Sequence, residues 1–153
     1  MGYVESDYGC DLLKDRSQTC YIFTLIGCAI SYKSMLQDIV AFSTTESEYR
    51  SMKKEIKEEI WLHSIIKSLG LKLEKPVLHC GCQSVLNLAK NAMYHKKTKQ
   101  IDVRLNFICD ILETYKFSIL KIDTKVYPTN MLIKAFPTVK FKLFLDLVGV
   151  GRS

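Results

Sequence analysis

The chain has 153 residues, a length that favours a single domain. Hydrophobic residues make up 48% of it, enough to bury a core without disulfide or metal staples. The formal net charge of +6 permits a polyanionic partner without requiring one. The sequence shows no secretory signal, so we expect its six cysteines to be reduced and the protein to be cytoplasmic. The longest apolar run, around residues 21–32, is too short to be a transmembrane segment.

The first part of the chain predicts three strands. Residues 2–7 form a short strand, and residues 9–18 read as a turn-rich loop. Residues 20–25 are β-branched and aromatic, and residues 29–34 alternate apolar with polar, which together predict a hairpin. Residues 38–42 are expected to be extended and to lead into a helix.

A long amphipathic helix is predicted next, ending near Gly70 after about 25 residues, or roughly 37 Å. Ser43 and Thr45 each precede a glutamate by three residues, the spacing of a capping box. Two interpretations of Glu48 therefore stay open: a helix cap, or a carboxylate that points into a metal-binding cluster. The apolar stripe that we expect to pack in the core comprises Tyr49, Met52, Ile56, Ile60, Trp61 and Ile66.

The second part of the chain predicts an alternation of strands and helices. Strands are predicted over residues 77–80 and 117–122, and helices over residues 85–90, 102–115, 129–135 and 138–148. Thr129 is expected to cap the third of these helices. Antiparallel strands followed by strand–helix alternation indicate an α/β protein with a mixed sheet and helices on its faces.

Several short motifs occur in a fixed order along the chain. They are Gly2-Tyr3, Tyr21-Ile22-Phe23-Thr24-Leu25, Ile30-Ser31-Tyr32-Lys33-Ser34, Ser43-Thr44-Thr45-Glu46-Ser47-Glu48-Tyr49, Glu59-Ile60-Trp61-Leu62, Leu88-Ala89-Lys90-Asn91, His95-Lys96-Lys97-Thr98-Lys99-Gln100-Ile101-Asp102-Val103-Arg104 and Met131-Leu132-Ile133-Lys134-Ala135. In this order the motifs resemble the ribonuclease H domain of copia-type LTR retrotransposon Pol polyproteins. The resemblance extends over residues 2–150.

The resemblance implies a ribonuclease H-like α/β fold, as one domain over residues 1–153. Its five-stranded mixed sheet has three antiparallel strands, then parallel strands, with helices on both faces. It also implies hydrolysis of the RNA strand of RNA/DNA hybrids, by a domain that is joined to a reverse transcriptase and acts in virus-like particles or the nucleus. Because the first predicted strand starts at Met1, we expect that strand to be truncated, at a cost in stability.

The family's reaction uses two Mg²⁺ (or Mn²⁺) ions about 4 Å apart, held by four carboxylates. Carried over to this sequence, the four positions fall at Glu5, Glu48, Gly81 and Asn130. Only Glu48 is unchanged. Glu5 is one methylene longer than an aspartate, Gly81 offers no side chain, and Asn130 offers an uncharged amide oxygen. Asp7, two residues along the same strand face, is a candidate substitute.

We therefore expect weak metal binding at Glu5 and Glu48 and a ribonuclease H that is inactive or strongly impaired, because groups that act as one unit lose most of the rate together. Two alternatives stay open. One is a weak, Mn²⁺-dependent enzyme that uses Glu5, Asp7, Glu48 and Asn130. The other is a non-catalytic nucleic-acid-binding remnant, or a translated transposon fragment without a function.

A basic segment follows the family's His-x-Arg-Thr-Lys pattern beside the active site. A basic run is usually a solvated loop, but in this context we expect it to contact phosphates of an RNA/DNA hybrid. The residues expected to bind nucleic acid are His95, Lys96, Lys97, Lys99 and Arg104.

A zinc site is a weaker alternative for the residues around the fourth predicted strand. His79, Cys80, Cys82 and His95 are all zinc-ligand types. The Cys-x-Cys pair lacks the second Cys/His pair at the spacing of structural zinc sites, so the end of a strand explains these residues better.

Overall fold

A computed structural model describes residues 1–11, 15–72, 75–81, 83, 86–87, 110–111, 114 and 117–151. The strands are β1 (Gly2–Asp11), β2 (Arg16–Leu25), β3 (Cys28–Leu36), β4 (Val77–Cys80) and β5 (Ser118–Lys121). The longer helices are α1 (Thr44–Ser68) and α4 (Thr138–Leu147). Two 3₁₀ helices lie between β5 and α4: η1 (Thr124–Val126) and η2 (Pro128–Leu132).

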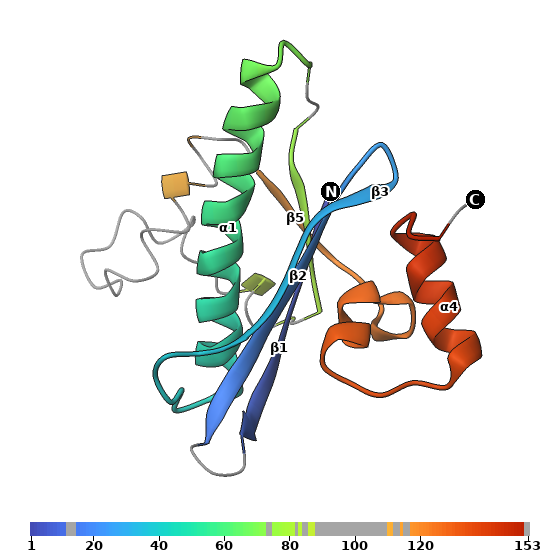
Figure 1. The fold of residues 1–153 in the computed structure, drawn as a ribbon. Helices are drawn as coiled ribbons and strands as arrows, with labels where there is room; N and C mark the ends of the chain where they lie inside the picture. The colour runs from blue at the N-terminus through green and yellow to red at the C-terminus, as the bar shows by residue number, and fades with distance from the viewer. Residues whose placement is uncertain are drawn as a thin grey trace.

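The strands form one five-stranded sheet in the order β3-β2-β1-β4-β5 (Figure 1). β1 pairs antiparallel with β2, and β2 antiparallel with β3. β4 pairs parallel with both β1 and β5. This confirms the predicted mixed sheet. β1 is its central strand. Glu5 pairs with Cys20 of β2 and lies one residue past Val4, whose partner Cys80 ends β4.

The prediction of a loop over residues 9–18 is wrong, because both strands of the first hairpin extend into it. β1 continues to Asp11, and β2 already begins at Arg16. The pairing shifts between Asp7 and Asp11, where Gly9 takes a φ of +62° that suits a bulge. Because this stretch is rich in polar residues, its sequence lacks the apolar pattern that predicts a strand. Ser17 is buried there and accepts a hydrogen bond from the Gly9 amide at 3.2 Å.

Helix α1 covers one face of the sheet, as predicted (Figure 1). Ser43 caps it, since its Oγ accepts from the Glu46 amide at 3.1 Å, and Glu46 Oε2 in turn accepts from the Phe42 amide at 2.9 Å. Glu46 is therefore the capping carboxylate, and Glu48 is left for another role. The core under α1 comprises Val4, Tyr21, Phe23, Tyr49, Met52, Ile56, Leu78, Cys80 and Phe117.

The other face of the sheet is covered by η2 and α4 (Figure 1). Helix α4 matches its prediction closely. The predicted helix over residues 129–135 is instead the short 3₁₀ helix η2, which begins at Pro128. Thr129 lies inside η2, and the capping residue is Tyr127, which makes no side-chain capping bond. Proline is well suited to the first helical position, so it moves the start ahead of Thr129.

Trp61 does not pack in the core as expected, because 57% of its surface is exposed. Its position on α1 lies outside the arc of the helix that contacts the sheet. The predicted helices over residues 85–90 and 102–115 lie mostly outside the described residues; Leu86, Asn87 and Asp110 are helical. Among the described helices, none combines the length and apolar character needed to cross a membrane.

Candidate active site

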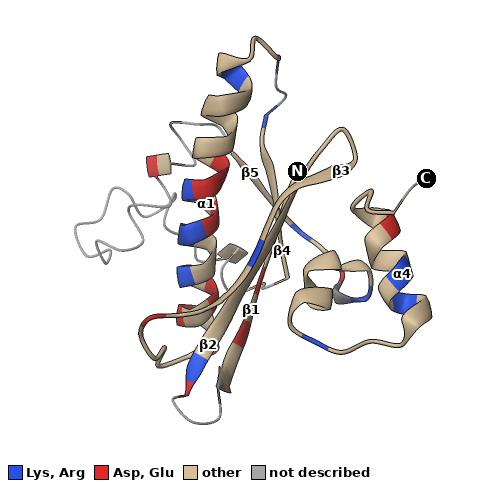
Figure 2. Cartoon of the chain, viewed as in Figure 1, with Lys and Arg blue, Asp and Glu red and all other residues tan. Residues whose placement is uncertain are grey.

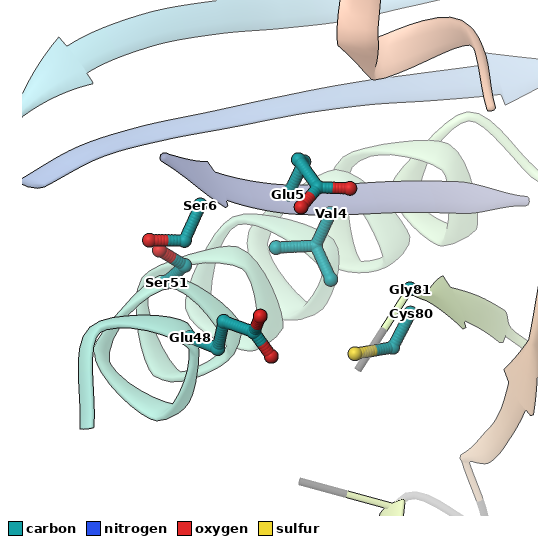
Figure 3. Close-up of a pocket in the computed structure, with 7 residues that line it drawn as sticks. All are labelled: Val4, Glu5, Ser6, Glu48, Ser51, Cys80 and Gly81. Atoms are coloured by element: carbon teal, nitrogen blue, oxygen red, sulfur yellow. The ribbon is translucent and has the colours of Figure 1, made fainter. Parts of the chain in front are cut away.

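Three of the four expected site positions meet at one small pocket. Glu5 comes from the middle of β1, Glu48 from the second turn of α1, and Gly81 from the end of β4. The residues that line the pocket are Val4, Glu5, Ser6, Glu48, Ser51, Cys80 and Gly81 (Figure 3). Acidic residues lie on both β1 and α1, the elements that carry the two glutamates (Figure 2).

A buried polar network fixes the first turns of α1 against the sheet and so places Glu48. Gln37 is 2% exposed, and its Nε2 donates to the Ser47 carbonyl oxygen at 2.9 Å. The hydroxyls of Thr19 on β2 and Ser51 on α1 are hydrogen-bonded at 2.7 Å. Ser6 on β1 is likewise hydrogen-bonded to Ser47. These bonds tie β1 and β2 to the helix next to the pocket.

Position 81 lies directly beside Glu5. A Cβ atom added to Gly81 would be 3.2 Å from Glu5 Oε2. The backbone of Gly81 is outside the left-handed region, so its conformation does not demand glycine. A carboxylate at position 81 would thus begin next to Glu5, as the resemblance implies, and the chain has no donor atom there.

The two carboxylates repel each other's charge. Burial, and then the negative charge of Glu5, raises the pKa of Glu48 to about 7. Burial also raises the pKa of Glu5, against a smaller lowering by the positive charge of Lys134. Glu48 Oε2 is buried and has no hydrogen-bond partner among the described residues. A cation placed between the two groups would lower both pKa values.

The residues of the pocket do not fit a pair of divalent ions. The cavity measures about 10 Å³, roughly the space of one water molecule. Within the part of the chain that the structure describes, no three His, Cys, Asp or Glu side chains converge as metal ligands would. Hard divalent ions need several converging carboxylates, and here Glu5 and Glu48 are the two that line the pocket.

Asn130 and Asp7 are not brought into this pocket. Asn130 lies on η2, which packs against β1 and β2, and it is 6% exposed. Its carbonyl oxygen accepts from the Lys134 amide at 2.9 Å. Asp7 is half-buried farther along β1, where the bulge begins. Neither residue lines the cavity between Glu5 and Glu48.

The basic segment with His95, Lys96, Lys97, Lys99 and Arg104 lies outside the described residues, as does Cys82. The zinc alternative meets a separate difficulty at β4. Cys80 belongs to the core under α1, whereas His79 stacks on Tyr3 with ring centroids 5.0 Å apart. Neighbouring residues of a strand point to opposite faces, so His79 and Cys80 do not converge on one ion.

Tyr127 is a residue of this site that the sequence did not single out. It is fully buried, and its hydroxyl donates to the His79 carbonyl oxygen at 3.0 Å. Its Cε1 would be 3.1 Å from a Cβ at Gly81. Nothing in the sequence places Tyr127 beside β4, because the residue lies 46 positions after Gly81 in the chain.

Glu55 is the second overlooked group. It is on α1, seven residues after Glu48, and is 0% exposed. Neither carboxylate oxygen has a hydrogen-bond partner among the described residues, and burial raises its pKa well above the ordinary range. The sequence could have indicated this buried carboxylate, since Glu55 falls between Met52 and Ile56 in the apolar stripe of the helix.

Comparisons with known proteins find relatives of this chain. The Retrovirus-related Pol polyprotein from transposon TNT 1-94 of Nicotiana tabacum is 43% identical over 152 residues, covering 99% of this chain and 11% of that protein. The corresponding polyprotein from transposon RE1 of Arabidopsis thaliana is 28% identical over 151 residues, covering 98% and 10%. The chain thus spans about a tenth of the length of these curated relatives. No model of a known protein family matches it.

A solved structure shares the fold. LC11-RNase H1 in complex with RNA/DNA hybrid superposes with a TM-score of 0.55 at 10% identity, covering 83% of this chain and 88% of that one. The strand order, the helix over β1 and this superposition define a ribonuclease H-like domain. The chain is thus homologous to a segment of retrotransposon Pol polyproteins and has a ribonuclease H-like fold, which agrees with its resemblance to the ribonuclease H domain of copia-type elements.

Proposed function

We propose that this ribonuclease H-like domain binds RNA/DNA hybrids and has lost most or all of its hydrolytic activity. The observation that carries the proposal is Gly81, which offers no donor atom where a side chain would begin 3.2 Å from Glu5 Oε2. Glu5 and Glu48 are the residues that would hold Mg²⁺ or Mn²⁺. When bound, such an ion would activate a water molecule and stabilise the leaving oxygen.

The side chains at the expected metal-ligand positions are poorly suited to binding these ions. Burial and the charge of Glu5 raise the pKa of Glu48 to about 7, so a divalent ion that binds near neutral pH has to compete with a proton there. Asn130 is neutral and lies outside the cavity. Metal affinity in such a centre depends on the number of carboxylates, and this pocket offers two, Glu5 and Glu48.

We propose nucleic-acid binding because of the positive net charge of the chain and its resemblance to ribonuclease H domains. The solved neighbour binds an RNA/DNA hybrid, and this chain has a net charge of +6. Lys96, Lys97 and Lys99 would contact phosphates, and binding would then weaken steeply with added salt. By the same resemblance, a reverse transcriptase segment is the expected neighbour of this domain in a polyprotein.

The proposal is tested with a labelled RNA/DNA hybrid. Wild type and Glu48→Gln are compared for cleavage in Mg²⁺ and then in Mn²⁺, and for binding at increasing salt. We expect binding that weakens with salt and cleavage no greater than that of Glu48→Gln. Cleavage that disappears in Glu48→Gln would instead establish the weak, Mn²⁺-dependent enzyme.

Hybrid binding is tested separately with lysine variants. Replacing Lys96, Lys97 and Lys99 by alanine should weaken hybrid binding about tenfold or more at low salt. A matched control removes three exposed lysines elsewhere, Lys33, Lys67 and Lys142, at the same cost in net charge. Equal losses in both triple variants would point to non-specific charge, and no binding by wild type would contradict the proposed function.

A further inference from the structure

Tyr127 occupies the space into which a side chain at position 81 would extend. Its ring carbon Cε1 would be 3.1 Å from a Cβ at Gly81, and Cδ1 3.6 Å. The first distance is tighter than ordinary van der Waals contact, and the second is ordinary. A carboxylate has further atoms beyond Cβ, so it would compete with this ring for the space beside Glu5.

The ring has little freedom to move away. Tyr127 is fully buried, its hydroxyl donates to the His79 carbonyl oxygen, and its edge meets Tyr3 with centroids 6.5 Å apart. His79 is on β4, two residues before Gly81. The hydrogen bond therefore holds the ring against the same strand end that would carry the carboxylate. Close-packed interiors accommodate an added group only by displacing neighbours.

We infer that Tyr127 leaves no room for a metal-binding carboxylate at position 81, so that the loss of that carboxylate is not the only defect of the site. The ring does not line the cavity, but it lies against position 81, where a Cβ would be 3.1 Å from Tyr127 Cε1 and 3.2 Å from Glu5 Oε2. The cavity itself has about the space of one water molecule. On this inference the carboxylate cannot be restored by one substitution. Shortening Tyr127 is a condition for metal binding.

The competing explanation is that charge alone is missing. In that case Gly81→Asp would bind metal by itself, with Tyr127 in place. The two explanations differ in a double substitution. Leucine at position 127 ends at its Cδ atoms, so it removes the 3.1 Å contact and keeps apolar bulk. Phenylalanine keeps Cε1 and removes only the hydroxyl, which makes Tyr127→Phe the matched control.

The test measures Mn²⁺ binding by electron paramagnetic resonance of the free ion, without nucleic acid. We expect the Mn²⁺ affinity of Gly81→Asp, alone or with Tyr127→Phe, to stay within about threefold of that of wild type. Gly81→Asp combined with Tyr127→Leu should bind Mn²⁺ about tenfold or more tightly than Gly81→Asp alone, a difference of ~1.4 kcal/mol. Equal affinities for Gly81→Asp and Gly81→Asp with Tyr127→Leu, whether weak or tight, would overturn the inference.

If the double variant Gly81→Asp with Tyr127→Leu does not fold, urea unfolding can test the same steric conflict between Tyr127 and position 81. Gly81→Ala adds only the Cβ atom. It should lower the urea midpoint of wild type and of the Tyr127→Phe variant, which both keep the ring, and lower that of the Tyr127→Leu variant less. Equal shifts in all three backgrounds would overturn the inference. It rests on the proposed assignment of Gly81 to a metal-ligand position; hybrid binding is not measured, so failure here leaves the proposed nucleic-acid function untouched.

Discussion

Glu5 and Glu48 face one another across a pocket, and the charge on Glu5 helps to raise the pKa of Glu48 to about 7. They come from different elements, the central strand β1 and the helix α1, 43 residues apart in the chain. In a metal-binding site this repulsion would be relieved by a cation. Here burial of Glu48 and the charge of Glu5 act together, and both favour a protonated Glu48.

The first prediction is a pH dependence of stability. The folded pKa of Glu48 lies above its ordinary value of 4.5, so the folded state holds more protons than the unfolded state between pH 4.5 and about 7. The free energy of unfolding should therefore fall as pH rises through this window. Glu48→Gln should flatten the curve. Urea unfolding at a series of pH values measures both, and an unchanged slope in Glu48→Gln would contradict the assignment.

A second prediction concerns Glu55, which is buried without a partner among the described residues. Its raised pKa adds to the same fall in stability with rising pH, and the cost persists to higher pH. Glu55→Leu should raise the free energy of unfolding at pH 8 by ~1–3 kcal/mol, because an unsatisfied buried polar group is removed.

Glu58 supplies the control for this change. It lies on the same helix and accepts a hydrogen bond from Ser31 Oγ at 3.3 Å. Glu58→Leu should be neutral or destabilising, since it removes a partnered group. Thermal and urea unfolding of both variants at pH 8 give the comparison. A loss of stability in Glu55→Leu would mean that its carboxylate has a stabilising role.

The fold was largely predictable from the sequence because its signals are local. The alternation of residues 29–34, the capping residue Ser43 and the helical spacing up to Gly70 each reflect contacts within a few positions. Errors arose where tertiary packing decides. Ser17 and its neighbours are polar but are paired in β2, and Trp61 has helical spacing but faces outward.

The candidate site was predictable only in part. The resemblance placed Glu5, Glu48 and Gly81, and the structure brings these three together. Tyr127 could not be foreseen, because its effect on position 81 depends on how the segment before η2 packs against β4, and no spacing in the sequence encodes that contact.

A third prediction tests how the pocket is positioned. Gln37 donates from Nε2 to the Ser47 carbonyl oxygen at 2.9 Å and to Thr19 Oγ1 at 3.1 Å. Gln37→Leu removes this donor from both acceptors, which keep their hydrogen bonds with Ser51 Oγ. The change should cost ~0.5–1.5 kcal/mol in the free energy of unfolding, the net value of a buried hydrogen bond. Gln18→Leu, at a less buried position on β2, should stay within about 0.5 kcal/mol of wild type. Similar losses in both would show that the network does not hold α1 in place.

The last prediction concerns recovery of hydrolysis. Glu5→Asp, Gly81→Asp and Asn130→Asp combined should remain inactive on a labelled RNA/DNA hybrid while Tyr127 is present, because its ring carbon Cε1 would still lie 3.1 Å from the Cβ of residue 81. Adding Tyr127→Leu should produce cleavage in Mg²⁺, and adding Glu48→Gln to that variant should remove it by about a hundredfold or more, since the metal ligands act as one unit. Cleavage that survives Glu48→Gln would identify a contaminating nuclease, and cleavage by the triple variant with Tyr127 intact would show that charge alone was missing.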